Sequence, residues 1–224
     1  MKILEIMENK NSLINPFEHI GLLHNQGLEY AFKLINEKTT LEQAVELASQ
    51  FMQCLDGDYT KNSLANNYAF ISESINRTEK IELNDFLDGL LEKKLITNEG
   101  ISFINEINNI SYDALNIPKE ILEIEKRILN SEMSVEDQRF PLIFATVTRN
   151  SAIFGINNSA ILYSRHWPWK KDGQGAIDGF ASGAITGAIT GGFPGSVVGA
   201  LTGAIGGGIG RSLVSWIKSL FSES

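Results

Sequence analysis

The chain contains one cysteine, Cys54, among its 224 residues, which excludes an internal disulfide framework. Its three histidines, His19, His24 and His166, do not combine with that cysteine at zinc-ligand spacing, so we expect no metal site. With 27 acidic against 19 basic residues, the net charge of -8 argues against a nucleic-acid partner. The sequence has no G-x-S-x-G elbow and no phosphate-binding loop with its lysine. We therefore predict that the protein is not an enzyme and binds no cofactor.

The opening segment, MKILEIMENKNSL, has too short an apolar run for a classical signal peptide. This predicts a cytoplasmic soluble form, which later associates with a membrane or is released by a route that the N-terminus does not encode. The sequence Asp56-Gly57-Asp58 begins like a calcium loop but lacks the later glycine and glutamate, so we reject it.

Residues 1–165 show the apolar spacing of an acidic helical body. Asn15 and Pro16 are a good helix cap and first position, and Thr39 with Glu42 forms a candidate capping box. His24 lies on the apolar side of the first helix, which favours a hydrogen-bonded core histidine over a ligand. Cys54 is expected to be a buried small hydrophobe. We predict helices over 16–35, 39–55, 64–75, 84–93, 118–128 and 135–154, and residues 95–104 fit either a small hairpin or a helical link.

Downstream, glycine recurs every fourth residue in a tetrad repeat of the form G-A-I-T. In a helix the residue after each glycine, mostly small, and the next, mostly aliphatic, lie roughly 100° and 200° around the axis. One face is then bare backbone, which permits close helix packing, and the opposite face is aliphatic. The predicted helix-packing residues are Gly175, Gly179, Gly183, Gly187, Gly191, Gly195, Gly199, Gly203 and Gly207.

Gly191-Gly192-Phe193-Pro194 interrupts this repeat at its centre. Since proline cannot continue a preceding helix, we predict a helical hairpin with arms at about 173–191 and 195–220. Each arm would span roughly 25–30 Å, near the thickness of a bilayer's hydrocarbon core.

Basic and aromatic residues flank both open ends of the hairpin, whereas its turn carries no charge. This is the arrangement of a hairpin whose ends share one membrane interface. The chain thus divides into an acidic helical body (1–165), a Trp/Lys linker (166–172) and a glycine-zipper helical hairpin (173–221). The predicted membrane-interface residues are Trp167, Trp169, Lys170, Lys171, Arg211, Trp216 and Lys218.

A hairpin buried in a soluble protein is the alternative to membrane insertion. Asp178, the one charge between Gly173 and Gly210, favours it mildly because a carboxylate at the membrane centre is costly. However, Asp178 lies near the Trp/Lys end, where interfacial water reaches. In the soluble state the body should shield the aliphatic face of the hairpin, which includes Ile185, Ile189, Leu201 and Ile205.

Two segments carry a resemblance. The stretch GAIDGFASGAITGAITGGFPGSVVGALTGAIGGGIG resembles the glycine-zipper hairpins of small bacteriocins and of membrane-inserting toxin segments. The stretch NPFEHIGLLHNQGLEY is similar to the start of a group of uncharacterised bacterial proteins that also end in a glycine zipper. The first resemblance implies a packing mode, and the second brings no established activity. The long acidic body and the missing leader depart from the bacteriocin pattern.

The sequence therefore predicts an all-α protein, a helical body with a C-terminal glycine-zipper helical hairpin. Its expected function is that of a membrane-inserting antibacterial toxin or pore-forming effector. The expected partners are a lipid membrane, further copies of the chain in that membrane, and an immunity or chaperone protein. The alternative is a soluble, non-enzymatic interaction or scaffold protein whose hairpin is buried in a core or an oligomer interface.

Overall fold

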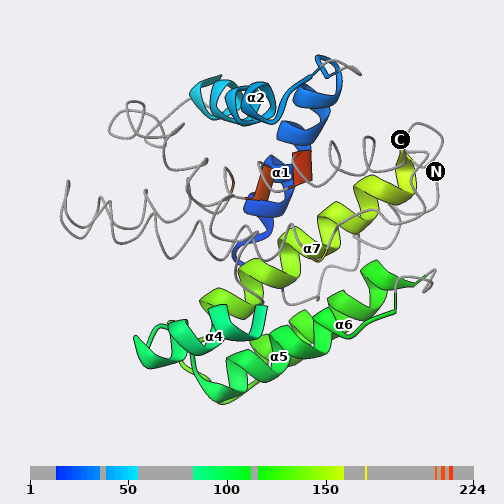
Figure 1. The fold of residues 1–224 in the computed structure, drawn as a ribbon. Helices are drawn as coiled ribbons and strands as arrows, with labels where there is room; N and C mark the ends of the chain where they lie inside the picture. Colours follow the sequence, from blue (N-terminus) through cyan, green and yellow to red (C-terminus); the bar gives the residue numbers. More distant parts are fainter. Residues whose placement is uncertain are drawn as a thin grey trace.

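The computed structural model describes residues 14–35, 39–54, 83–111 and 116–158, and further along the single residues Lys170, Ile205, Gly208, Ile209, Ser212 and Leu213. Throughout this part the regular elements are α-helices, with no strand among them, which confirms the all-α class. Figure 1 shows them as α1 (Glu18–Phe32), α2 (Leu41–Cys54), α4 (Leu83–Glu92), α5 (Asn98–Asn108), α6 (Ile117–Leu129) and α7 (Arg139–Asn157).

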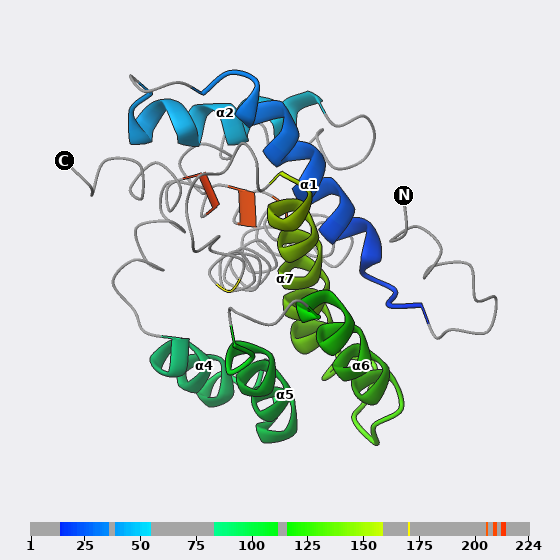
Figure 2. The ribbon, with the colours of Figure 1, turned by 90° about the vertical axis from the view of Figure 1, so that its right-hand side faces the viewer.

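Helix α7 lies at the centre, between α1 and α2 on one side and α4, α5 and α6 on the other (Figures 1 and 2). It contacts α1, α5 and α6, and every residue from Phe140 to Ala152 is buried. A helix that is buried all round forms the core of its domain. The polar side chains that α7 carries into this core therefore need partners inside the protein.

The surrounding helices are amphipathic and turn their aliphatic faces inward. Helix α6 buries Ile121, Ile124 and Ile128, one turn apart, and α5 buries Ile104 and Ile107. The helical apolar spacing of α1, α2 and α4 is confirmed at nine side chains that are buried: Ile20, His24, Leu28, Ala31, Ala48, Phe51, Met52, Leu87 and Leu90. Four side chains that follow the same spacing are only half-buried: Phe17, Ile35, Phe86 and Leu91.

Three predicted helix starts are corrected by local hydrogen bonds. Asn15 does not cap α1 directly: its Oδ1 accepts from the Phe17 amide at 2.9 Å, its Nδ2 donates to the Leu142 carbonyl at 3.0 Å, and the helix begins at Glu18. The capping box of α2 is Thr40 with Gln43, one residue beyond the predicted pair of Thr39 and Glu42.

Helix α7 begins at Arg139 instead of Val135, because residues 135–138 form turns. There the Ser134 hydroxyl accepts from the Asp137 amide at 3.2 Å and donates to its carboxylate at 2.8 Å. The uncertainty over residues 95–104 is resolved as a helical link. Thr97 caps α5 by accepting from the Gly100 amide at 3.2 Å.

Several predictions lie outside the described residues. These are the helix at 64–75, the environment of the Cys54 side chain, the linker except Lys170, and the course and turn of the hairpin. Of the hairpin the structure describes Ile205, Gly208, Ile209, Ser212 and Leu213.

Helices α1 and α7 approach each other closely at Gly21. A Cβ atom built there would lie 2.4 Å from Nδ2 of Asn150 and 2.7 Å from the backbone oxygen of Thr146. Both distances are far below van der Waals contact, so any side chain at position 21 would push the two helices apart. Gly89, in α4, has no heavy atom within 4 Å of the corresponding point.

We predict opposite effects for the same substitution at these two glycines. Gly21→Ala should lower the free energy of unfolding by about 1–3 kcal/mol through overpacking. Gly89→Ala should raise it by about 0.5–1 kcal/mol, because alanine is the better helix former and the site is open. Urea denaturation followed by circular dichroism measures both changes. Equal changes in the two variants would contradict the close approach of α1 and α7.

Candidate functional site

The described residues of the hairpin form one buried helical face, here named the C-terminal stripe. It consists of Ile205, Gly208, Ile209, Ser212 and Leu213, which are helical; each lies three or four residues from others of the set, so all five lie along one side of a helix. Ile205, Ile209, Ser212 and Leu213 are each 0% exposed, and the three aliphatic side chains belong to the same hydrophobic core as those of α1 and α7. The burial predicted for Ile205 is thus confirmed, whereas Ile185, Ile189 and Leu201 lie outside the described residues.

Gly27 of α1 leaves the space that one side chain of this stripe occupies. A Cβ atom at Gly27 would lie 2.2 Å from Cδ1 of Ile209 and 3.0 Å from a ring carbon of Phe51 in α2. The isoleucine thus occupies the space that a side chain at position 27 would need. Figures 1 and 2 both show the C-terminal residues, in red, beside α1.

A polar contact accompanies this apolar one, three residues away on α1. Nε2 of His24 lies 3.1 Å from the Ser212 hydroxyl, and Nδ1 lies 3.2 Å from Oδ1 of Asn25. The Ser212 hydroxyl is also 3.0 Å from the Gly208 carbonyl, one turn earlier in the stripe. His24 is 0% exposed, so the prediction of a hydrogen-bonded core histidine is confirmed.

The grouping of Ser212, His24 and Asn25 superficially resembles a nucleophile, base and orienting residue. Ser212 and His24 are both 0% exposed, and the serine is bonded within its own helix. A substrate carbonyl therefore has no path to the hydroxyl. The arrangement joins the C-terminal stripe to α1 and does not form an open nucleophile site.

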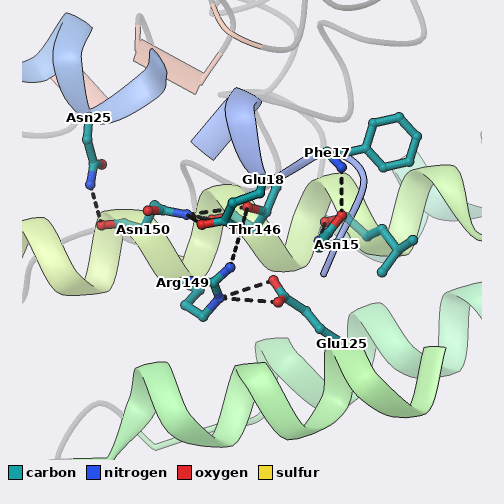
Figure 3. Close-up of polar contacts among 9 residues, drawn as sticks. Asn15, Phe17, Glu18, Asn25, Glu125, Thr146, Arg149 and Asn150 are labelled. Atoms are coloured by element: carbon teal, nitrogen blue, oxygen red, sulfur yellow. Dashed lines mark hydrogen bonds and ion pairs between the residues drawn. The ribbon is translucent and has the colours of Figure 1, made fainter. Parts of the chain in front are cut away.

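A second polar cluster joins α1, α6 and α7 on the other side of α1 (Figure 3). Arg149 of α7 forms an ion pair with Glu18 of α1, and its Nε donates to both oxygens of Glu125 in α6 at 3.2 and 3.3 Å. The exposed fractions of the three side chains are 8% for Arg149, 16% for Glu18 and 2% for Glu125. One cation thus lies between two carboxylates in a largely dry interface.

Hydrogen bonds from neutral side chains complete this network. Thr146 donates to Glu18 at 3.0 Å, and Asn150 donates to its other oxygen at 3.3 Å. Asn25 donates to the Asn150 carbonyl at 2.9 Å, which links the ion network to the neighbour of His24 (Figure 3). Buried charges are tolerated when they are paired and hydrogen-bonded in this way.

Burial shifts the protonation of three groups in these contacts. It raises the pKa of Glu125 to about 7, although Arg149 opposes that shift. Burial also disfavours the Arg149 cation, but Glu125 and Glu18 outweigh it and keep the pKa of Arg149 above its ordinary value. Burial lowers the pKa of His24 to about 4, against hydrogen bonds to the Asn25 side chain and to the Gly208 backbone, which raise it.

Most of the residues predicted for the membrane site lie outside the described part of the chain. This holds for all nine zipper glycines and for Trp167, Trp169, Lys171, Arg211, Trp216 and Lys218. Lys170 is described as helical and half-buried, and burial lowers the pKa of its ammonium group.

No other candidate site emerges within the described ranges. A shallow groove of about 660 Å³ lies between α5 and α6, but its wall mixes both charges, and its Arg127 is paired with Glu106. Over the same residues no three acidic, histidine or cysteine side chains converge as metal ligands. None of the described helices combines the length and apolar character needed to cross a bilayer.

Sequence reasoning missed the ion network and the two glycine contacts on α1. A signal for the network existed: Glu125 falls between Ile121 and Ile128 on the apolar face of α6, and Arg149 follows a segment of α7, Phe140–Thr148, that carries no charge. Charges in such positions are rarely left unpaired. Nothing in the sequence named their partners or the residue that Gly27 accommodates.

Comparison with known proteins identifies no relative. The chain matches no protein family, and no match is found among curated proteins or among solved structures. The resemblance to glycine-zipper proteins therefore depends on the two quoted segments alone.

We predict that Arg149→Met lowers the free energy of unfolding by about 3–5 kcal/mol, because it leaves buried carboxylates without a cation. The loss should be larger at pH 8 than at pH 5.5, where protonation removes the charge of Glu125. Chemical denaturation at the two pH values measures it.

Arg139→Met is the matched control, since Arg139 pairs with Glu136 at 3.4 Å on the exposed surface. Such a pair contributes at most about 1 kcal/mol. If the two variants are equally stable, the proposed importance of the Arg149 network is wrong.

Proposed function

We propose that this protein is a membrane-inserting antibacterial toxin or pore-forming effector whose C-terminal hairpin is stored against the helical body until it meets lipid. The observation that carries the proposal is the close contact of Ile209 with Gly27, together with the burial of Ile205 and Leu213 in the same core. These aliphatic side chains need either a protein core or a lipid phase around them. The body meets that need in the absence of a membrane.

The composition of the hairpin supports this function. Its residues are rich in glycine, alanine and threonine, so a single copy gains little free energy from hydrocarbon and insertion should involve several copies. The aromatic and basic residues at its open ends suit the interface of an anionic membrane.

A soluble scaffold or interaction protein is the second candidate. The hydrogen bond between His24 and Ser212 favours it, because a buried polar contact with defined partners suits a permanent core. The two candidate functions predict different effects of weakening the contact between Ile209 and Gly27. In a membrane-inserting protein it should promote lipid binding, whereas in a scaffold protein it should only destabilise the fold.

We predict that Gly27→Leu increases binding of the full-length protein to anionic liposomes, measured by flotation and by dye release at neutral pH. The leucine would occupy the space of Ile209 and displace the C-terminal stripe without changing its sequence. Gly89→Leu is the matched control, since the same side chain enters open space in α4.

Far-ultraviolet circular dichroism establishes that each variant keeps its helices. A folded Gly27→Leu protein that binds and permeabilises liposomes no better than Gly89→Leu would favour the scaffold function. Binding that rises equally in both variants would also count against storage at Gly27.

A further inference from the structure

The contact of the C-terminal stripe with α1 has an apolar part and a polar part. At Gly27, Cδ1 and Cγ1 of Ile209 lie 2.2 and 2.8 Å from the position of a Cβ atom. Three residues earlier on α1, Nε2 of His24 lies 3.1 Å from the Ser212 hydroxyl. Ile209 and Ser212 are both 0% exposed, so each contact is made inside the protein.

The apolar part does not by itself define which residue of the C-terminal segment lies at Gly27. An aliphatic residue recurs at every fourth position on both sides of Ile209: Val197, Leu201, Ile205, Ile209, Leu213 and Ile217. Displacing the helix by one tetrad, about 6 Å along its axis and about 40° around it, would bring the next aliphatic side chain to Gly27. Apolar burial is non-directional, so it alone discriminates little between these registers.

The polar part does discriminate between them. Every fourth residue through Ser212 gives a series that contains a single hydroxyl group: Ala200, Ala204, Gly208, Ser212 and Trp216. With Leu213 at Gly27, the indole of Trp216 would have to enter the space of Ser212, which is fully buried. A side chain of that size would overpack the core, so this displacement is excluded.

A displacement in the opposite direction loses the polar contact. It would bring Ile205 to Gly27. Gly208 would then lie opposite His24 and would present no hydroxyl to the imidazole. The hydrogen bond of His24 with the Gly208 backbone does not distinguish the registers, because every residue of the stripe has a carbonyl group. The observed register is therefore the one in which His24 meets a hydroxyl without a steric conflict.

We propose that the contact between His24 and Ser212 sets the register of the C-terminal stripe on α1. His24 is then a positioning residue, and Ile209 lies at Gly27 because Ser212 lies at His24. One buried polar contact sets the register of coiled coils in the same way. Since a hydroxyl both donates and accepts, this role does not depend on which protons the imidazole carries.

The register has a meaning for the proposed function and a meaning without it. As the storage position of a membrane-inserting hairpin, it rests on the function proposed above. As a position of one helix on another, it can be measured in solution without lipid.

The test exchanges two residues of the stripe in the full-length protein, Gly208→Ser together with Ser212→Gly. The exchange keeps the composition and moves the hydroxyl one tetrad earlier, so the stripe should follow it by one tetrad. Methyl NMR reads the register. In the wild type the strongest nuclear Overhauser effect from the Gly27 α-protons should reach the δ1 methyl of Ile209, and in the exchange variant that of Ile205.

His24→Leu is the matched control, since it replaces the imidazole by an apolar side chain of similar volume. With this substitution in both backgrounds, apolar fit alone selects the register. The exchange of Gly208 and Ser212 should then leave the strongest contact of Gly27 unchanged. A purely structural role of His24 would not make the register depend on where the hydroxyl lies.

Ser212→Ala provides a second variant if the exchange variant does not dock. Loss of one hydrogen bond should raise the intensity ratio of the Ile205 effect to the Ile209 effect about fivefold. An exchange variant whose strongest Gly27 contact stays with Ile209 would overturn the proposal. So would an unchanged ratio in Ser212→Ala, or a register that follows the serine equally well in His24→Leu.

Flotation of the wild type with anionic liposomes separates this proposal from the proposed function. A register that follows the serine, in a protein that does not bind liposomes, supports the role of His24 and contradicts membrane insertion. Lipid binding by the wild type, with a register that ignores the exchange, supports insertion and contradicts the role of His24.

Discussion

The close contact of α1 with α7 is the constraint on which the rest of the described structure depends. Helix α7 is buried all round and brings Arg149 into the core, where a lone cation would be strongly destabilising. Glu18 reaches that cation because Gly21, one turn later on α1, allows the two backbones to approach. Glu125 completes the pairing from α6. The ion network thus depends on the close approach of the two helices at Gly21, and that approach brings Glu18 to the buried cation that it neutralises.

Two faces of helix α1 contact two different parts of the protein, α7 and the C-terminal stripe. Glu18, Gly21 and Asn25 face α7, at spacings of three and four residues. His24 and Gly27 face the C-terminal stripe, three residues apart. Asn25 bonds to both His24 and Asn150, so the two contacts share one side chain. The contact with the stripe and the contact with α7 are therefore linked through Asn25.

The sequence predicted the all-α class and most inward-facing positions because apolar spacing reports the buried side of each helix. It placed helix starts less well, since the hydrogen bonds of Asn15, Thr40 and Ser134 depend on tertiary contacts or on a choice between neighbouring caps. It identified His24 as a core histidine but gave no sign of Ser212, which is 188 residues away. Pairings across such a separation are determined by packing and leave no local pattern.

The central claim is that the same aliphatic residues pack on α1 in solution and face lipid at a membrane. Its most direct test is methyl NMR of Ile209 in the full-length protein. The account predicts nuclear Overhauser effects between the Ile209 δ1 methyl and the α-protons of Gly27 in solution. In the complex with anionic nanodiscs these should be replaced by contacts with acyl-chain protons. Persistence of the Gly27 contact in the lipid-bound protein, or its absence in solution, would contradict the account.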